Sequence, residues 1–346
     1  MPRDQVDMFV LRSLMNLPVR VQRVLAGRSV VLDGQRLAPE TQLMLRLHDL
    51  ARLPYIEDLP LAQARKALVD QARLVGGDQP VGSVRDLSVD GAAGPIPARL
   101  YTPTERLGAR AAPTLLFIHG GGMMYGDLDS HDAACRHLAE QSGVQLLAID
   151  YRLAPENPFP AAVEDCAAAY RWLVANAESV GADRERLAVG GDSAGAYLSA
   201  TTAMIAAQEG LPLVFQLLVY PVTDFTTRSR SRELFGEGFF LTTAFIDGAQ
   251  AAYLPTDADL SDPRASVLKT RDFPAGLARA LVVTAGYDPL RDEGEAYARL
   301  LHEHGVRVEQ IRYPSMIHGF FNVVGCGHQA PSYNKRIAAK LRAALD

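Results

Sequence analysis

The chain has 346 residues, 48% of them hydrophobic and 22% charged, as expected of a globular protein with a sizeable core. Its formal net charge of −5 argues against a nucleic-acid partner, because phosphates require a basic protein surface. The three cysteines, with no C-x-x-C pair, argue against a disulfide scaffold or a zinc ribbon and favour a reducing, cytoplasmic compartment.

The first 28 residues mix apolar and basic side chains. Arg12, Arg20, Arg23 and Arg28 accompany apolar residues at positions 6, 9, 10, 14 and 17. This pattern predicts an amphipathic helix packed on the body of the protein, with a membrane-surface role as the weaker alternative. The apolar run follows acidic residues and is interrupted by Pro18, unlike a secretory signal, and no stretch of the chain is long enough to predict a membrane span.

The pattern changes near residue 80. Leucines at 43, 47, 50 and 53, and a second helical pattern after Pro60, predict helices that end at the breaker sequence of residues 76–80. We therefore expect an N-terminal helical cap region at 1–80 and a catalytic domain at 81–346. The phenylalanine-rich segment at about 225–268 predicts a cap insertion, which we expect to pack with the N-terminal helices over the site.

From residue 84 onward, short apolar runs alternate with helical segments. Residues 84–89 and 96–101 predict a pair of strands joined by a turn. Five further runs, typical of strands buried on both faces, lie at 114–118, 145–149, 187–189, 215–219 and 281–284. Helices are predicted near 130–142, 161–177, 195–209, 293–305 and 333–345. The alternation predicts an α/β fold, with a mostly parallel sheet flanked by helices.

Four separated pieces of the sequence contain the candidate catalytic residues. Three of these pieces directly follow predicted strands. They are His-Gly-Gly-Gly at 119–122, Gly-Asp-Ser-Ala-Gly at 191–195, Asp288 and His318. Because ligands bind beyond the carboxyl ends of parallel strands, we expect these pieces to converge at one edge of the sheet. The order Ser, Asp, His along the chain is that of serine hydrolases with a sharp strand-to-helix turn at the nucleophile.

A serine hydroxyl is a poor nucleophile, so each of the other pieces has a predicted task. His318 is expected to accept the proton of Ser193, and Asp288 to orient and stabilise the imidazole. The backbone N–H groups of Gly121, Gly122 and Ala194 are expected to form an oxyanion hole for the negative charge that develops on the attacked carbonyl. His119 is expected to anchor its loop by a hydrogen bond. No cluster of residues has the spacing of metal ligands, so no metal is expected.

Other residues compete for these roles. Asp292, Asp262 and Asp272 are rivals of Asp288, which is favoured because it follows a strand through a glycine-containing loop. His302, His304 and His328 are rivals of His318, which is favoured by the strand before it and the glycine after it. Cys326 is the one cysteine with the sequence context of a reactive thiol, and Ser193 is strongly favoured over it as the nucleophile. Cys135 and Cys166 are expected to be small core residues.

The motifs together resemble the hormone-sensitive-lipase family of α/β-hydrolases, the bacterial esterases with an HGGG motif. Beyond the pieces above, the matching stretches are Gly-Asp-Leu-Asp at 126–129, Tyr-Arg-Leu-Ala-Pro-Glu at 151–156, Asp-Pro-Leu-Arg-Asp-Glu-Gly at 288–294 and His-Gly-Phe at 318–320. The similarity runs from about residue 38 to the end. The resemblance implies an α/β-hydrolase fold with a helical cap, the triad and oxyanion hole named above, and hydrolysis of short- to medium-chain carboxylic esters without a cofactor.

Two departures from the family pattern bear on specificity. Ala196 and Tyr197 follow the serine motif where the family usually has Gly-Asn, and Met123 and Met124 follow the HGGG motif. We expect the substrate pocket to be lined by Met123, Met124, Tyr197, Phe239 and Phe240, with ordinary core packing as an equal alternative.

The predicted function is that of a serine carboxylesterase acting on a small-molecule ester through an acyl-Ser193 intermediate. The same chemistry would serve a deacetylase, an amidase or a lactonase, and these alternatives stay open. A non-catalytic small-molecule receptor on the same fold is a further alternative, which the presence of His318 disfavours. A homodimer through the last strand and helix is also left open.

Overall fold

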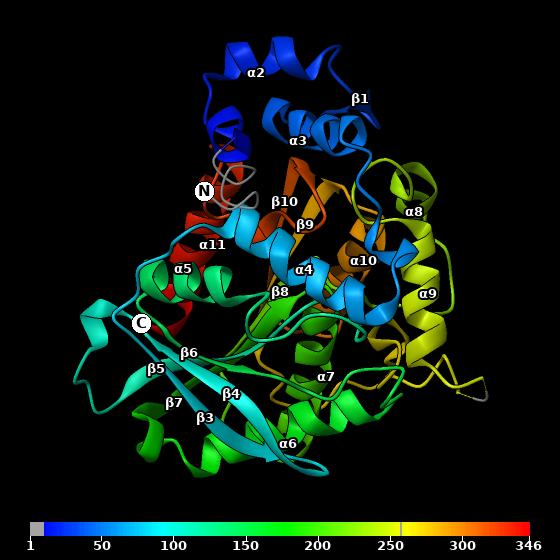
Figure 1. The fold of residues 1–346 in the computed structure, drawn as a ribbon. Coiled ribbons are helices and arrows are strands. Elements are labelled where there is room, and N and C mark those ends of the chain that lie inside the picture. Colours follow the sequence, from blue (N-terminus) through cyan, green and yellow to red (C-terminus); the bar gives the residue numbers. More distant parts are fainter. Residues whose placement is uncertain (1–9, 257) are drawn as a thin grey trace.

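The computed structural model describes residues 10–256 and 258–346, and Figure 1 shows their arrangement as a central sheet with helices on both sides. The sheet has eight strands in the order β10-β9-β8-β7-β5-β6-β4-β3. In chain order their bounds are β3 Ser83–Gly91, β4 Gly94–Thr102, β5 Ala112–Ile118, β6 Gln145–Ile149, β7 Ala182–Asp192, β8 Phe215–Val219, β9 Arg279–Tyr287 and β10 Val308–Ile317. Within this sheet, β4 runs antiparallel to its neighbours β3 and β6, and the other pairs are parallel. The predicted, mostly parallel α/β sheet is confirmed.

Two apolar layers cover the two faces of the sheet. On β5, Leu116 and Ile118 pack with helices α6 (Ala161–Ala175), α7 (Ala194–Gln208) and α10 (Arg291–Glu303). Leu115 and Phe117, which alternate with them, pack with α5 (Asp132–Ser142) and α11 (Gln329–Leu345) on the other face. Because successive side chains of a strand point to opposite faces, the continuous apolar run of β5 serves both layers. The central strands are therefore fully buried.

The segments outside this sandwich lie near the carboxyl ends of the strands. The N-terminal part holds α2 (Val19–Ala26), a hairpin of β1 (Val31–Leu32) and β2 (Gln35–Arg36), α3 (Pro39–Leu50), the 3-10 helix η1 (Ile56–Asp58) and α4 (Leu61–Gly76). The insertion after β8 forms α8 (Arg230–Phe235) and α9 (Thr243–Tyr253). Ile56 and Ala64 of the first segment share an apolar cluster with Phe245 of the second, so the two segments pack together.

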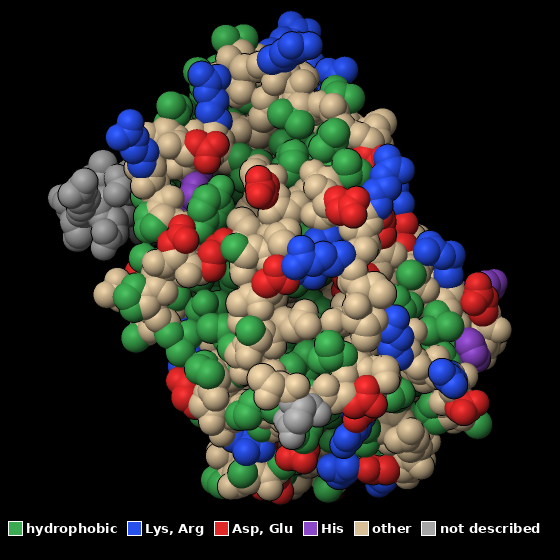
Figure 2. Space-filling model, turned by 90° about the vertical axis from the view of Figure 1, so that its right-hand side faces the viewer, with side chains coloured by type: hydrophobic (Ala, Val, Ile, Leu, Met, Phe, Trp, Pro, Cys, Tyr) green, Lys and Arg blue, Asp and Glu red, His purple; other side chains and the backbone are tan. Residues whose placement is uncertain are grey.

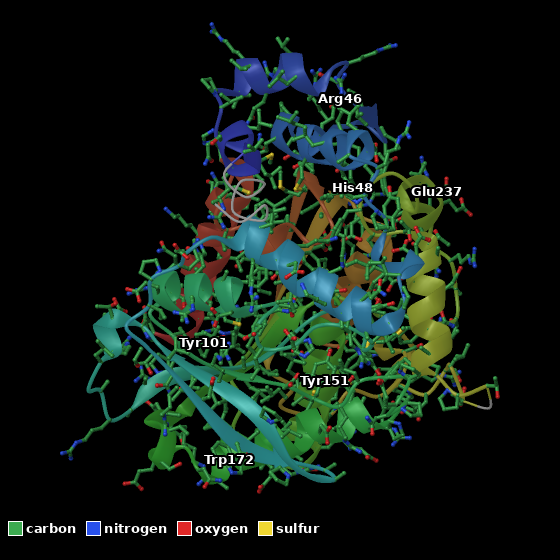
Figure 3. The ribbon with its side chains drawn as sticks, viewed as in Figure 1. Arg46, His48, Tyr101, Tyr151, Trp172 and Glu237 are labelled. Carbon is green, nitrogen blue, oxygen red and sulfur yellow. The ribbon has the colours of Figure 1, made fainter. Side chains whose placement is uncertain are left out.

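The helix expected at the N-terminus is broken in two at Pro18, and the apolar positions 6 and 9 lie outside the described residues. Residues 10–15 are helical, and α2 follows the proline and packs against α3. Arg46 lies on the α2 side of α3 and His48 on the side that faces the sheet (Figure 3). Figure 2 shows basic and hydrophobic side chains together at the top of the molecule, where α2 lies. No helix of residues 10–256 and 258–346 has the length and apolar content to cross a bilayer.

Candidate active site

Ser193 lies on a sharp turn between β7 and α7. Its backbone has φ 56° and ψ −120°, a conformation that is strained for a residue with a side chain. Its N–H donates to the carbonyl of Val219 at 2.8 Å, which holds the turn against the neighbouring strand. A Cβ at Gly191 or Gly195 would come within 2.0 or 1.9 Å of the Ile118 carbonyl oxygen. The two glycines therefore let the turn approach β5 and present the hydroxyl group beyond the sheet.

His318 and Asp288 are brought to this hydroxyl from two neighbouring strands. Asp288 follows β9 directly and His318 follows β10, so the parallel pairing of these strands places both at the same edge. The Nε2 atom of His318 lies 2.9 Å from Ser193 Oγ, and its Nδ1 lies 2.8 Å from Asp288 Oδ2. If Nδ1–H donates to the carboxylate, Nε2 is left to accept the serine proton. Asp288 is fully buried, and the N–H of Leu290 donates to its other oxygen at 2.8 Å.

The HGGG loop places backbone N–H groups next to Ser193. Gly121 and Gly122 have φ values of 115° and 63°, which glycine adopts without strain. In residues 10–256 and 258–346, the N–H groups of Gly121, Gly122 and Ala194 have no acceptor within the protein. Gly121 and Ser193 line the same cavity. The predicted oxyanion donors thus lie beside the serine with their hydrogen-bonding capacity unused.

A buried carboxylate holds the loop and the serine turn together. Asp192 Oδ1 accepts the Gly120 N–H at 3.1 Å and lies 3.2 Å from Nε2 of His131. Its Oδ2 accepts the hydroxyl of Tyr220 at 3.2 Å and the side-chain amide of Asn322 at 3.3 Å. Burial acts to raise the pKa of Asp192, but the charge and hydrogen bond of His131, with further help from the Gly120 N–H, outweigh it and lower the pKa. Asp192 is therefore an ionised anchor.

His119 is held as a neutral ring within the HGGG loop. Burial, followed by the charge of His131, lowers its pKa to about 4. Its Nδ1 lies 2.8 Å from the carbonyl oxygen of Gly120, and its ring stacks on Tyr151 with centroids 4.4 Å apart. The Tyr151 hydroxyl donates to the His119 carbonyl at 2.9 Å. These contacts fix the loop through its first residue and agree with the anchoring task expected of His119.

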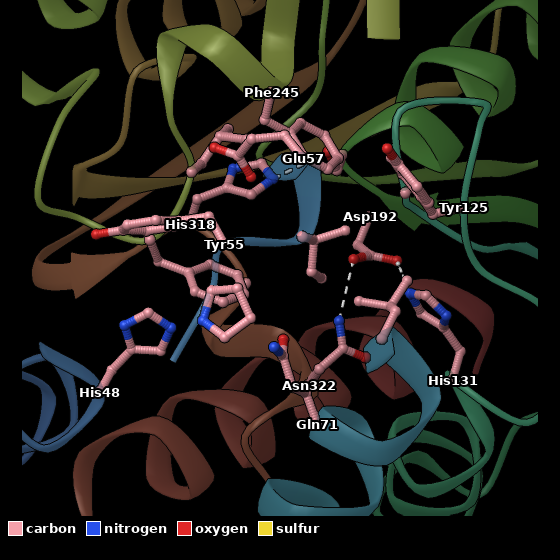
Figure 4. Close-up of a pocket in the computed structure, with 18 residues that line it drawn as sticks. His48, Tyr55, Glu57, Gln71, Tyr125, His131, Asp192, Phe245, His318 and Asn322 are labelled. Atoms are coloured by element: carbon pink, nitrogen blue, oxygen red, sulfur yellow. Dashed lines mark hydrogen bonds and ion pairs between the residues drawn. The ribbon is translucent and has the colours of Figure 1, made fainter. Parts of the chain in front are cut away.

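A small cavity of about 100 Å³ opens over Ser193 and His318 (Figure 4). The N-terminal segment and the insertion form much of its wall. The lining residues from these two segments are His48, Pro54, Tyr55, Ile56, Glu57, Leu68, Gln71, Phe240, Leu241 and Phe245. The carbonyl oxygens of the Gln71 and Asn322 side chains are buried without a partner in the described part of the chain. The cavity thus combines apolar walls with a few free acceptors.

Comparison with known proteins identifies the family. A family model described as the alpha/beta hydrolase fold matches residues 115–322. The chain is 45% identical over 340 residues to the carboxylic ester hydrolase LipN of Mycobacterium tuberculosis, covering 95% of this chain and 89% of that protein. The chain belongs to the α/β-hydrolase fold family. The resemblance to its hormone-sensitive-lipase type is confirmed.

A further relative and a solved structure are also named as ester hydrolases. The ethyl acetate hydrolase of Pseudomonas putida is 40% identical over 75% of this chain and 83% of its own length. The structure of an ester hydrolase from the metagenome of Lake Arreo, in complex with a bipyridine phosphonate derivative, is 44% identical. It superposes with a TM-score of 0.85 and covers 89% of this chain and 98% of that one. The fold of this α/β-hydrolase is therefore shared along most of its length.

Five residues were predicted to line the substrate pocket. Of these, Phe240 alone lines the cavity found in the described part of the chain. Met123 is buried in the main core, and Met124 packs against that core from its edge. The Tyr197 ring is fully buried, and its hydroxyl donates to the Arg264 carbonyl at 2.5 Å. Phe239 packs against Phe235 and Tyr287. At Met123 and Tyr197, which are buried in the sandwich, this placement agrees with the alternative of core packing.

The rival residues lie elsewhere in this α/β-hydrolase. His302 is exposed on α10 and His304 is exposed at the C-cap of that helix, and His328 contacts the carbonyl of Leu17. The rival aspartates lie apart from the serine: Asp292 and Asp262 pair with arginines, and Asp272 is exposed. Cys326 is buried, and burial raises its thiol pKa to about 11. No group of metal-ligating side chains occurs in the part of the chain that the structure describes.

The sequence interpretation missed the residues that converge on Asp192. Asp192 itself lies inside the serine motif as the last residue of β7, and a charged residue at the end of the buried run 187–191 was a usable signal of a buried anchor. His131 at the start of α5, Tyr220 after β8 and Asn322 after His318 carry no comparable signal. Each is an ordinary polar residue beside a predicted element, and only the packing of the α/β-hydrolase sheet brings them together.

Proposed function

We propose that this protein is a serine carboxylesterase that hydrolyses small carboxylic esters through an acyl-Ser193 intermediate. The observation that carries the proposal is the hydrogen-bonded chain from Ser193 through His318 to Asp288, with links of 2.9 and 2.8 Å at the base of a cavity. Relatives named as carboxylic ester hydrolase, ethyl acetate hydrolase and carboxylesterase support the choice of ester as substrate.

The first half of the reaction transfers the acyl group to the enzyme. Ser193 Oγ attacks the ester carbonyl carbon while its proton passes to His318 Nε2. The carbonyl oxygen becomes negative and is stabilised by the N–H groups of Gly121, Gly122 and Ala194, each donor typically contributing about 3–4 kcal/mol. The tetrahedral intermediate then expels the alcohol, which takes the proton from His318. The product of this half is the acylated serine.

The second half repeats these steps with water. His318 removes a proton from a water molecule, whose oxygen attacks the acyl carbon on Ser193. The same N–H groups stabilise the second oxyanion. Its collapse releases the carboxylic acid and returns the proton from His318 to Ser193 Oγ. Asp288 keeps the imidazole in the required tautomer throughout and stabilises its charged form. No cofactor or metal takes part in either half.

We propose that the acyl group is short to medium in length. Phe240, Leu241 and Phe245 of the insertion, and Tyr55 and Ile56 of the N-terminal segment, line the cavity over Ser193. We propose that these two segments act together as a cap over the catalytic domain, as the division at residue 80 and the insertion at 225–268 predict. We also propose a cytoplasmic location, which three buried free cysteines support.

Hydrolysis of p-nitrophenyl esters of increasing acyl length tests the proposal. Wild type should turn over acetate and butyrate esters rapidly and long-chain esters slowly. Ser193→Ala should lose this activity, whereas Ser179→Ala, at an exposed serine, should retain it. Equal activity of Ser193→Ala would refute the assignment of the nucleophile. Matched amides and lactones in the same assay test the open alternatives. The mass of the protein in solution tests whether it forms a homodimer, which the sequence leaves open.

A further inference from the structure

The short helix α2 turns its apolar side chains away from the protein. Its buried residues are Gln22 and Ala26, one turn apart, and the helix packs against α3. Val24 is 79% exposed and Val21 is 42% exposed on the opposite side. Most helices of globular proteins bury their apolar stripe, whereas α2 buries a polar glutamine and exposes its valines. We call its exposed residues the α2 face: Val19, Arg20, Val21, Arg23, Val24 and Leu25.

The orientation of α2 is fixed by hydrogen bonds on its inner side. The side-chain amide of Gln42 donates to the carbonyls of Ala26 and Arg28 at 3.0 and 2.8 Å. The guanidinium of Arg46 donates to the carbonyl of Leu25 at 2.9 Å. The buried amide of Gln22 donates to the carbonyl of Met15 at 2.5 Å. A buried polar side chain needs such partners, so rotating α2 to bury its valines would break this set.

The α2 face is positively charged in a protein whose net charge is −5. No aspartate or glutamate occurs between residues 10 and 32 of the sequence. Arg20 and Arg23 of the face and the neighbouring Arg28 are exposed, and the ion pairs of the described residues include none of them. Arginines elsewhere are commonly paired, as Arg99 is with three aspartates. Exposed valines are therefore combined with free cationic groups on one surface.

Exposed apolar side chains also lie at the end of α3 and in the loop that follows it. Leu50, at the end of α3, is 68% exposed, and Leu53 in the following loop is 53% exposed. Next to them in sequence, His48 and Pro54 line the cavity. Asp49 is the one acidic side chain of the last turn of α3. Exposed leucines thus lie in sequence beside two residues of the cavity wall. Figure 2 shows basic and hydrophobic side chains together at the top of the molecule, where α2 lies.

We propose that the α2 face docks on an anionic lipid surface. An interfacial helix places apolar side chains at the boundary of headgroups and acyl chains while its basic groups meet the phosphates. Val24 would enter deepest, because it is the most exposed residue of the helix, and Arg20 and Arg23 would lie at headgroup level. Association with a second copy of the chain through the same face is disfavoured, because a two-fold interface would bring these arginines against one another.

Docking through the α2 face would bring α3 close to the lipid surface, because α2 packs against α3. Leu50 and Leu53 lie in sequence next to His48 and Pro54 of the cavity wall. An ester dissolved in that surface could then reach Ser193 from the side of Leu50 and Leu53. This consequence rests on the proposed function, whereas lipid binding itself does not. Binding is therefore measured on a Ser193→Ala background, so that failure to bind and failure to hydrolyse esters are separate results.

Co-sedimentation of the full-length protein with vesicles tests the proposal. Vesicles of phosphatidylcholine and phosphatidylglycerol in equal parts should bind the protein, and vesicles of phosphatidylcholine alone should bind it far more weakly. Binding should fall as salt is added, since salt screens the arginines. Each arginine near such a surface changes the partition coefficient about fivefold, so Arg20→Gln with Arg23→Gln should weaken it about 25-fold.

Two further variants separate the contributions and give the control. Val21→Ser with Val24→Ser should weaken binding while leaving its salt dependence in place. Arg110→Gln with Arg184→Gln, exposed arginines outside the α2 face, should bind as wild type does. Each set of changes is also made in the protein that retains Ser193. Turnover of a short soluble ester by that protein shows whether the variant is folded. Absence of binding to anionic vesicles, or an equal loss in the Arg110 and Arg184 control, would overturn the proposal. A dimer that the α2 changes dissociate would overturn it in favour of self-association.

Discussion

Glu293→Gln should stabilise the protein by an amount that grows with pH. Glu293 lies on α10, is 7% exposed, and accepts the backbone N–H of Thr223 at 2.8 Å. Burial raises its pKa from the ordinary 4.5 to about 8, against the opposing effect of the Thr223 N–H, and the charge of Asp224 adds to the rise. The folded protein therefore keeps this carboxyl group protonated at neutral pH, whereas the unfolded chain ionises it.

The magnitude follows from the two pKa values. Below the unfolded value of 4.5 both states hold the proton, and the group has no effect on pH dependence. Between 4.5 and about 8 the unfolded state alone releases it, so the free energy of unfolding falls by about 1.4 kcal/mol per pH unit. The accumulated loss is about 3 kcal/mol at pH 7 and levels off near ~5 kcal/mol above pH 8. A neutral glutamine can still accept the Thr223 N–H and does not titrate. The free energy of unfolding of the variant therefore lacks this pH-dependent decrease.

The assay is urea unfolding of wild type and Glu293→Gln at pH 5, 6, 7 and 8. The difference in free energy of unfolding should increase steadily over this range, whatever constant offset the substitution brings. Glu303→Gln provides the control, because Glu303 is exposed on the same helix, and its difference from wild type should stay flat. A difference for Glu293→Gln that is constant or decreases with pH would refute the account of a buried, protonated carboxyl group.

Two further substitutions test the geometry around Ser193. Gly126→Ala should lower kcat by about 10²–10³-fold, since its Cβ would lie 2.5 Å from the Gly120 carbonyl oxygen and displace the loop that carries the oxyanion donors. Gly248→Ala, where nothing lies within 4 Å, should leave steady-state kinetics unchanged, and equal losses in both variants would contradict the argument. Asp288→Asn should lower kcat by about 10³–10⁴-fold with little change in circular dichroism, because an amide favours the wrong tautomer of His318; near-normal turnover would remove Asp288 from the mechanism.

The sheet and the positions of the key residues could be predicted from the sequence because both depend on local patterns. Apolar runs such as 114–118 are buried on both faces, and they can be recognised as strands without knowing which strands lie beside them. Asp288 and His318 each follow a strand, and parallel strands end at the same edge. The relation of Ser193 to its partners is therefore a consequence of topology, which alternation of strands and helices is enough to predict.

The cavity walls could not be predicted in this way. Tyr55 and Phe245 come from segments nearly two hundred residues apart, and their meeting depends on how the N-terminal helices dock on the insertion. Tyr197 carries no sign of its direction, because α7 is buried on almost all sides and has no distinct polar face. The exposure of the valines of α2 could not be predicted either. The side of α2 that is buried is the one that carries Gln22, whose amide is hydrogen-bonded to the Met15 carbonyl.

The central claim is that Ser193 carries the acyl group during turnover. The most direct test is to mix the enzyme with excess p-nitrophenyl acetate, quench within the first turnover, and locate the acetyl group by peptide mass spectrometry. We predict a burst of p-nitrophenol that approaches one equivalent if deacylation is the slower half, and an acetyl group on the peptide that contains Ser193. An acetyl group on another residue, together with undiminished turnover by Ser193→Ala, would contradict the account.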